Sequence, residues 1–265
     1  MKKIFLMMLA SILILPAMAQ EEPKDKKRER REARKNRINS IAKQEEEGVV
    51  RYRKHTIFGG KLTSDGYGFF MEVARAQSVK KALLFQLELS ERKHPKEEKI
   101  SSDFSSSPII FGKINYVYPI KLGVQQQFLL GNKGNKNGVS VTANAGGGIS
   151  LALLRAYEIE RTVNNQRVSY IYESADSAMY LSALSDVTSS GPTLFKGWSH
   201  VTMTPGAYLK GSLRFDYGKF NEMVNALEVG VAGEFYSKKI PQMIYQKQRQ
   251  FFFSAYVAVM FGRRK

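Results

Sequence analysis

The stretch KALLFQLELSER, from Lys81 to Arg92, decides the fold class. Two sets of side chains alternate along it: apolar Leu83, Phe85, Leu87 and Leu89, and polar Gln86, Glu88, Ser90 and Arg92. A period of two residues places successive side chains on opposite faces of a β-strand. The stretch therefore predicts a strand with one apolar face and one polar face.

Seven other stretches repeat this alternation, and turn residues separate them. They cover residues 54–63, 67–76, 116–130, 139–153, 204–217, 226–237 and 250–261. Short alternating segments of this kind are typical of transmembrane β-strands, and single-chain bacterial barrels have an even number of them. Every stretch has a nearly uncharged apolar face, so none looks like the protected edge strand of a soluble sandwich. We expect an all-β protein: an eight-stranded antiparallel up-and-down transmembrane β-barrel.

The connections between these stretches fall into two length classes. Those on one side are short: 77–80, 131–138 and 218–225. The opposite side carries the Asp65-Gly66 pair, which predicts a tight hairpin turn, and the longer connections 93–115, 158–202 and 238–249. Outer-membrane barrels have short periplasmic turns and long external loops. We therefore expect a periplasmic N-terminus and a long external loop over 158–202, with a small hairpin at 168–172 and a helical turn at 178–184.

The first 51 residues divide into two segments that precede the barrel domain, 52–265. Residues 1–19 combine a basic start, an apolar run from Ile4 to Leu15 and the end Ala17-Met18-Ala19, which predicts a cleaved secretory signal peptide. Residues 20–51 are rich in Lys, Arg and Glu and cannot bury an apolar face. We expect a short charged N-terminal helix or tail in the periplasm, serving as a linker or as a binding segment for the cell wall or a periplasmic partner.

The composition limits the partners. The chain has 41 Lys and Arg against 24 Asp and Glu, a net charge of +17, and no cysteine. In an exported protein this charge favours outer-membrane lipid and lipopolysaccharide phosphates over nucleic acid. Other envelope proteins are further candidate partners. The lack of cysteine excludes thiolate ligands, and the scattered histidines His55, His94 and His200 form no metal motif, so we expect no metal and no cofactor.

Strand parity predicts which charged side chains point into the barrel. Five are basic and five are acidic: Lys61, Arg92, Lys121, Lys210 and Arg214, and Glu72, Glu88, Asp216, Glu228 and Glu234. An eight-stranded barrel has room for little more than its own side chains, and unpaired buried charges are costly. We therefore predict a plugged, charge-paired lumen. The turn positions predict that Arg214 neighbours Glu228, and that Lys61 lies opposite Phe70 and diagonal to Glu72.

The long external loop carries five aromatic residues that are candidates for binding: Tyr170, Tyr172, Tyr180, Phe195 and Trp198. Exposed aromatic side chains on a rigid scaffold suit recognition of a protein, a glycan or a surface lipid. The alternative is that they only pack the loop onto the barrel rim.

A signal peptide, eight alternating stretches, a glycine-rich strand at 139–153 and an aromatic last strand together resemble small outer-membrane barrels of the OmpA/OmpX or PorT-like kind. The resemblance is architectural and covers Tyr52 to Phe261; the tail Gly262-Arg263-Arg264-Lys265 departs from barrels that end on an aromatic residue. It implies a non-enzymatic barrel that acts as an envelope scaffold or as a loop-display or assembly protein. The PorT-like resemblance also implies an alternative role as an accessory factor for protein export across the outer membrane.

A second alternative is a lipid-modifying hydrolase that uses His200 and a nearby serine. Ser199 directly precedes His200, and adjacent residues of a strand point to opposite faces. That geometry is poor for a nucleophile and its base. We therefore expect no catalytic residues.

Overall fold

The computed structural model describes residues 30–36, 54–78, 80–101, 107–133, 138–173, 177–186, 188–218 and 222–264. The chain divides into two units, Met1–Gln44 and Glu45–Lys265. In the first unit residues 30–36 are helical and exposed, which matches the charged helix that was one of two expectations for this segment. The predicted signal peptide lies outside the described residues. Within the described part of the chain, no helix is both long and apolar enough to span a bilayer.

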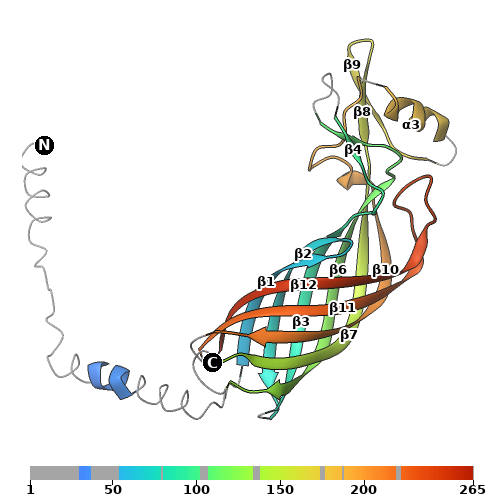
Figure 1. Ribbon diagram of the computed structural model, residues 1–265. Coiled ribbons are helices and arrows are strands. Elements are labelled where there is room, and N and C mark those ends of the chain that lie inside the picture. Colours follow the sequence, from blue (N-terminus) through green and yellow to red (C-terminus); the bar gives the residue numbers. More distant parts are fainter. Residues whose placement is uncertain are drawn as a thin grey trace, which may run out of the picture. The chain divides into compact units, whose positions relative to one another are not determined.

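Eight strands form the wall of the second unit. They are β1 (Lys54–Thr63), β2 (Gly66–Ala76), β3 (Lys81–Arg92), β6 (Asn115–Gly131), β7 (Ser140–Ala156), β10 (Val201–Asp216), β11 (Met223–Ile240) and β12 (Arg249–Arg264). Each pairs antiparallel with its neighbour in the chain, and β1 pairs with β12 to close the ring (Figure 1). The predicted eight-stranded up-and-down barrel is confirmed.

The alternation in sequence becomes an alternation of faces. Along β12, Phe251, Phe253 and Phe261 are exposed on the outer wall, whereas Tyr256 and Met260 are buried inside. The same pattern runs along β3, β10 and β11, where the exposed large apolar residues share one parity and the residues of the other parity between them are buried or half-buried. Because β1 pairs with β12, the sheet closes on itself, and the backbone polar groups of its paired segments bond within the wall.

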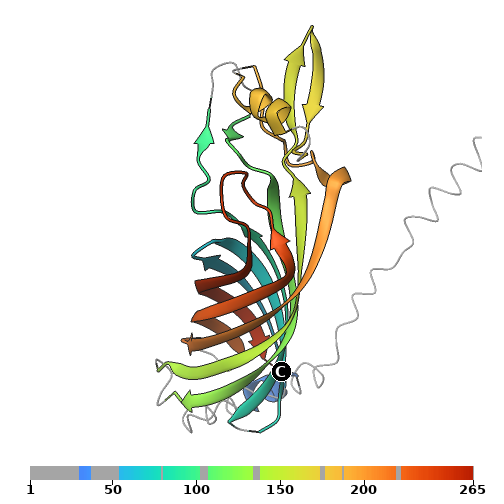
Figure 2. The same cartoon turned by 90° about the vertical axis from the view of Figure 1, so that its right-hand side faces the viewer.

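The strands are unequal in length. Strands β1 to β3 have 10, 11 and 12 residues, whereas β6, β7, β10, β11 and β12 have 16 to 18. About 9–11 tilted residues cross a bilayer core, so the long strands exceed that length. Figure 2 shows β7 and β10 rising past the ends of β1 and β2 into a folded extension.

We call this extension the cap, defined by the described residues 93–101, 107–114, 157–173, 177–186, 188–200 and 241–248. It contains the pairs β4 (Lys99–Ile100) with β5 (Ile109–Ile110) and β8 (Ile159–Val163) with β9 (Gln166–Tyr170), the helix α3 (Ser177–Leu184) and the 3₁₀ turn η1 (Trp198–His200). Its core consists of Ile109, Ile110, Tyr157, Ile159, Tyr180 and Leu184. The polar connection 93–115 therefore contributes buried isoleucines to a small core of its own.

Two expectations about turns are wrong. The first hairpin turns at Ser64-Asp65, since Gly66 already pairs with Thr63 in the ladder. A side chain at Gly66 would collide with the Glu91 carbonyl, so this glycine serves the close approach of two strands. The shift moves the register by two residues and sets Lys61 opposite Gly68 instead of Phe70.

The hairpin of the long loop also lies elsewhere than predicted. Its strands are β8 and β9, and its turn is Asn164-Asn165 instead of a turn within 168–172. Both asparagines have positive φ, 50° and 62°, as the two central residues of a type I′ turn require. The helical turn predicted at 178–184 coincides with α3.

Candidate functional site

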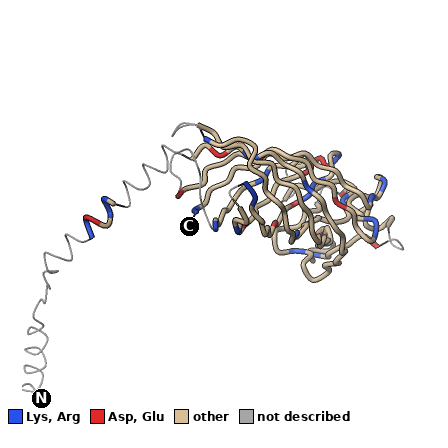
Figure 3. Tube along the Cα trace, turned by 90° about the horizontal axis from the view of Figure 1, so that it is seen from below, with Lys and Arg blue, Asp and Glu red and all other residues tan. Residues whose placement is uncertain are grey.

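The structure places the ten predicted charged residues on the inner face of the barrel. None is more than 6% exposed: Lys61, Glu72, Glu88, Arg92, Lys121, Lys210, Arg214, Asp216, Glu228 and Glu234. Figure 3 marks basic and acidic positions along the strands of the wall. Charges in so confined a space are tolerated only when they are paired and hydrogen-bonded.

Arg214 is the centre of the first group. Its Nη1 and Nη2 donate to both carboxylate oxygens of Glu72, each at 2.7 Å. Its Nε and Nη2 donate to Glu228 Oε2 at 2.9 and 2.8 Å. Glu228 is its direct neighbour on β11, as predicted, whereas Glu72 lies on β2, four places away in the ring of eight. The Arg214–Glu72 pair therefore crosses the full width of the lumen.

Further polar groups complete this first group. Lys210 Nζ donates to Glu228 at 3.1 Å and to Gln86 Oε1 at 2.9 Å. The Tyr256 hydroxyl donates to Glu228 at 2.8 Å and the Asn144 amide donates to it at 3.1 Å. His55 Nε2 lies 3.1 Å from Glu72 Oε1. Each carboxylate thus has several donors, as a buried anion needs.

A second group lies closer to the cap. Glu88 accepts from Lys61 and Lys121 at 2.9 Å. Lys121 also lies 2.6 Å from Glu234, which accepts from Arg92 at 2.7 Å. Arg92 is on β3 and Glu234 is on β11, again four places apart. Two ion pairs at different heights therefore span the barrel from wall to wall.

Lys61 has a partner other than the predicted one, and Asp216 lies apart from both groups. Lys61 bonds to Glu88 and not to Glu72, because the register differs from the expected one. Asp216 lies at the end of the barrel far from the cap, where it contacts Arg264, Lys133 Nζ at 3.7 Å and the Gly218 amide.

Sequence reasoning missed several members of the lumen. Parity places His55, Tyr236 and Tyr256 on the inner face together with Gln86, which the alternation along 81–92 already assigns to the polar face. Tyr236 donates to Glu234 at 2.6 Å, and the Gln125 amide donates to Gln86. Asp65 accepts from Arg92 at 2.6 Å; it lies in the Ser64-Asp65 turn, where strand parity does not apply.

The five aromatic residues of the long loop have different roles. Tyr180 is 1% exposed and its hydroxyl donates to the Lys113 and Tyr157 carbonyls, so it packs the cap and is closed to a partner. Tyr170 and Tyr172 are half-buried against the same core. Phe195 and Trp198 are 89% and 46% exposed. Only these last two retain the exposure that a binding role requires.

Burial changes the acid–base properties of the cap. Desolvation raises the pKa of Tyr157 to about 12, although its oxygen accepts from the Ile110 amide at 2.8 Å. Desolvation raises the pKa of Tyr180 still further. It lowers the pKa of Lys113, which is held at 2.5 Å from Glu97.

A groove lies on the outer wall where the barrel meets the cap. We call it the rim groove. It has a volume of about 370 Å³ and is lined by Tyr67, Gly68, Phe69, Leu89, Ser90, Glu91, Tyr118, Pro119, Ile120, Leu153, Arg155, Leu194 and Trp198. The buried Arg155 guanidinium carbon lies 4.3, 5.6 and 5.5 Å from the ring centres of Tyr116, Tyr118 and Trp198. Sequence reasoning did not single out Arg155.

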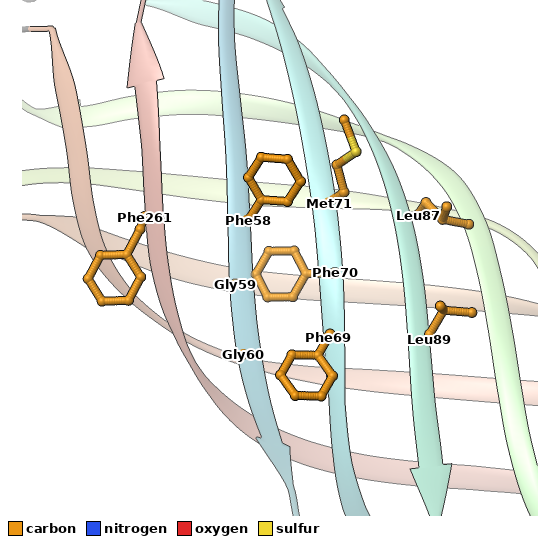
Figure 4. Close-up of a pocket in the computed structure, with 9 residues that line it drawn as sticks. All are labelled: Phe58, Gly59, Gly60, Phe69, Phe70, Met71, Leu87, Leu89 and Phe261. Atoms are coloured by element: carbon orange, nitrogen blue, oxygen red, sulfur yellow. The ribbon is translucent and has the colours of Figure 1, made fainter.

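A second, purely apolar depression of about 410 Å³ lies lower on the wall, around Gly59 and Gly60 (Figure 4). Figure 4 shows Phe58, Phe69 and Phe261 surrounding it and the ring of Phe70 lying beside Gly59. The residues that line the depression carry no charged side chain. It therefore offers space for hydrocarbon and no charged group that could bind a polar ligand.

The argument against a hydrolase assumed a strand at Ser199-His200. That expectation is wrong, because both residues belong to the exposed 3₁₀ turn η1. Across the described ranges, no serine hydroxyl or carboxylate hydrogen-bonds to the His200 ring. In the same part of the chain, no three His, Asp or Glu side chains are grouped as a metal site would need.

No family model and no curated protein matches the chain. Solved structures that resemble it include the N-terminal β-barrel domain of OprF from Pseudomonas aeruginosa, at 9% identity and a TM-score of 0.33, covering 80% of this chain and 98% of that one. Neisserial surface protein A, NspA, has 8% identity and a TM-score of 0.37, covering 80% and 96%. Ail, the attachment invasion locus protein of Yersinia pestis, has 9% identity and a TM-score of 0.36, covering 81% and 100%. Likeness at this level carries no argument about function, which has to rest on the chain's own residues.

Proposed function

We propose that the chain is a non-enzymatic integral outer-membrane barrel that displays its cap as a recognition or assembly surface and conducts no solutes. The observation that carries this proposal is the combination of a closed barrel with an apolar outer wall and a lumen crossed by ion pairs. Each part has its own support and its own test.

The outer wall supports insertion into a bilayer. Large apolar side chains on it are widely exposed, among them Leu62 and Phe69 at 71%, Leu209 at 72% and Ile149 at 66%. Soluble monomers rarely expose contiguous apolar patches beyond a few hundred Å². A closed barrel satisfies its backbone hydrogen bonds internally, which hydrocarbon demands.

The lumen supports a scaffold role over transport. Arg214–Glu72 and Arg92–Glu234 connect opposite walls at two heights. Opening a path would leave buried charges unpaired, which costs about 3–5 kcal/mol for each broken pair. The charged set therefore favours a closed interior.

The cap supports display. It has its own core, and it carries Leu194 and Phe195 at 79% and 89% exposure. Exposed apolar anchors on a rigid body are typical of protein-binding surfaces. We propose another envelope protein as the partner of the cap and outer-membrane lipid, including lipopolysaccharide, as the surroundings of the wall.

The proposed orientation sets the cap outside the cell and the N-terminus in the periplasm. All cap segments and the Ser64-Asp65 turn share one end of the barrel, and the 77–80 turn lies at the other. Because the chain has no cysteine, single cysteines make a clean test. We expect Arg167→Cys on β9 to react with a membrane-impermeant maleimide on intact cells, and Lys80→Cys to react only after the outer membrane is permeabilised.

Two results would contradict the proposal. If Lys80→Cys but not Arg167→Cys were labelled on intact cells, the orientation would be the reverse of the proposed one. Recovery of the full-length chain as a detergent-free soluble protein would exclude insertion. For the lumen, the purified barrel in planar bilayers should give no steady ion conductance; stable channels in the wild-type protein would replace the scaffold role with transport.

A further inference from the structure

We infer that the rim groove binds one phosphate-bearing membrane lipid, with its headgroup at Arg155 and an acyl chain along Phe69, Leu89, Ile120 and Leu153. This inference rests on the proposed function. The groove opens on the outer wall, and that wall faces lipid only if the barrel is inserted in a bilayer. It goes beyond the proposal that lipid surrounds the wall, because it names one site and the chemistry of the headgroup bound there.

Arg155 differs from the buried cations of the lumen in its partners, and this difference is the first argument. The residue is 3% exposed, and no carboxylate pairs with it among the described residues. Its Nη1 donates to the Leu194 carbonyl at 2.5 Å, whereas its Nε is buried without a hydrogen-bond acceptor. By contrast, the five lumen cations of the central barrel all have carboxylate partners. A buried guanidinium without an anion is costly, and a ligand would supply the anion.

The direction of Arg155 is the second argument. It shares the parity of Leu151 and Leu153, which face outward on β7, and it pairs with Tyr116 on β6. The guanidinium is therefore on the lipid side of the wall and not in the lumen. Tyr116, Tyr118 and Trp198 surround it, with Tyr118 and Trp198 stacked at 5.7 Å. Tyrosine and tryptophan gather at membrane–water interfaces, where lipid headgroups lie.

The gradient of polarity along the groove is the third argument. Its lower part is formed by Phe69, Leu89, Ile120 and Leu153, and its upper part by polar groups next to the cap. Ser90 is engaged by its hydrogen bond to the Pro119 carbonyl, and the Trp198 ring nitrogen donates to the Leu194 carbonyl. A lipid matches this arrangement, because its acyl chains are apolar like the lower part of the groove and its headgroup is polar like the upper part.

Among the described residues that line the groove, Glu91 is the one acidic group. Its carboxylate accepts from the Tyr67 hydroxyl at 2.5 Å, and Lys93 Nζ lies 4.9 Å from the centre of the Tyr67 ring. A phosphate beside Glu91 would be repelled, so the headgroup belongs at the Arg155 side. Removing the Glu91 charge should therefore strengthen binding, an effect that a purely apolar groove would not show.

The test uses native mass spectrometry of the purified full barrel in detergent, with dioleoyl phosphatidic acid as the probe. Dioleoylglycerol supplies the same chains without phosphate, and inorganic phosphate supplies the anion without chains. We expect one phosphatidic acid per barrel, weak retention of dioleoylglycerol and no competition by inorganic phosphate at equal concentration. Equal retention of dioleoylglycerol would overturn the headgroup assignment, and effective competition by inorganic phosphate would reduce the site to a simple anion site.

Variants tie the signal to the groove. We expect Arg155→Gln to weaken retention about tenfold, as loss of a charge-assisted contact of ~1.4 kcal/mol implies. Ile120→Trp fills the apolar part while leaving Arg155 in place and should weaken retention similarly, so the test does not depend on one variant's folding. Glu91→Gln should strengthen retention. The control is Arg167→Gln on the exposed β9, which should change nothing.

Failure of the site and failure of the proposed function differ in their results. If Arg155→Gln and Ile120→Trp retain phosphatidic acid like the wild type while the barrel is still recovered in the outer membrane, the lipid site is wrong and the membrane barrel stands. If the wild-type chain is absent from the membrane fraction, the proposed function fails first.

Discussion

Arg214 on β10 forms a two-pronged ion pair with Glu72 on β2, a strand on the opposite side of the barrel. The same guanidinium also binds Glu228 on the adjacent strand β11. One side chain therefore joins three strands of the wall. Such a contact ties the shape of the barrel to the identity of one residue.

Replacing Arg214 by methionine should destabilise the barrel. Glu72 and Glu228 would lose their shared partner while buried, at a cost of about 3–5 kcal/mol. Urea unfolding in lipid vesicles measures the difference. Arg263→Met is the matched control, because Arg263 is exposed on β12 and should shift stability by less than about 0.5 kcal/mol. The double variant Arg214→Met with Glu72→Met should recover part of the loss; no recovery would mean that the cost is steric instead of electrostatic.

The network also predicts a conductance change. Arg92→Ser combined with Glu234→Ser removes the cross-lumen pair nearest the cap and replaces two long side chains by short ones. Water should enter the upper lumen, and single-channel recordings should show brief openings that the wild type lacks. The control, Arg75→Ser, alters an exposed cation outside the lumen and should leave the bilayer silent. Equal openings in both variants would argue for general loosening of the barrel.

The barrel could be read from the sequence because the membrane-facing pattern is periodic. Each strand repeats every two residues, so Lys210, Arg214 and Glu228 were placed on the inner face without knowledge of the fold. Parity gives the face but not the height. The partners Glu72 and Glu234 across the lumen depend on the stagger between strands, which no single strand encodes.

The cap core and the rim groove could not be predicted from the sequence, for a different physical reason. Tyr157, Tyr180 and Ile110 meet through contacts between distant segments with no period to detect. Arg155 has the parity of a lipid-facing residue, a position where a cation is unexpected. A cation at a lipid-facing position of a strand is the sequence feature that could have identified Arg155.

Two adjacent glycines of β1 should respond oppositely to the same substitution. A side chain at Gly59 would meet the Phe70 ring and, at 2.8 Å, the Val259 carbonyl, whereas a Cβ at Gly60 meets no atom within 4 Å. Gly59→Val should therefore destabilise the barrel by about 1–3 kcal/mol through overpacking. Gly60→Val should be tolerated, because it points into the open depression of Figure 4. Urea midpoints in vesicles compare the two, and a larger loss for Gly60→Val would contradict the assignment of inner and outer faces.

The cap should open at alkaline pH while the barrel persists. Burial raises the pKa of Tyr157 from 10.0 to about 12, so the folded cap holds this proton more tightly than the unfolded segment does. Its contribution to cap stability is complete below pH ~10 and is lost as the pH rises toward about 12. Tyr180, whose pKa is also raised by burial, acts in the same direction. Lys113 acts in the opposite direction, because burial lowers its pKa and its charge becomes less of a penalty as the pH rises.

Phenylalanine variants isolate the tyrosine contribution from that of Lys113. Near-ultraviolet circular dichroism of the barrel in micelles should show loss of the cap signal across this pH range, while the far-ultraviolet strand signal remains. Tyr157→Phe removes the titrating hydroxyl and the oxygen that accepts from Ile110, so the cap should be about 1 kcal/mol less stable at neutral pH but should lose less stability between pH 10 and about 12. Tyr245→Phe changes a tyrosine that is 64% exposed and should leave the transition where it is. If Tyr157→Phe left the transition unchanged, ionisation of that buried hydroxyl would not be what opens the cap.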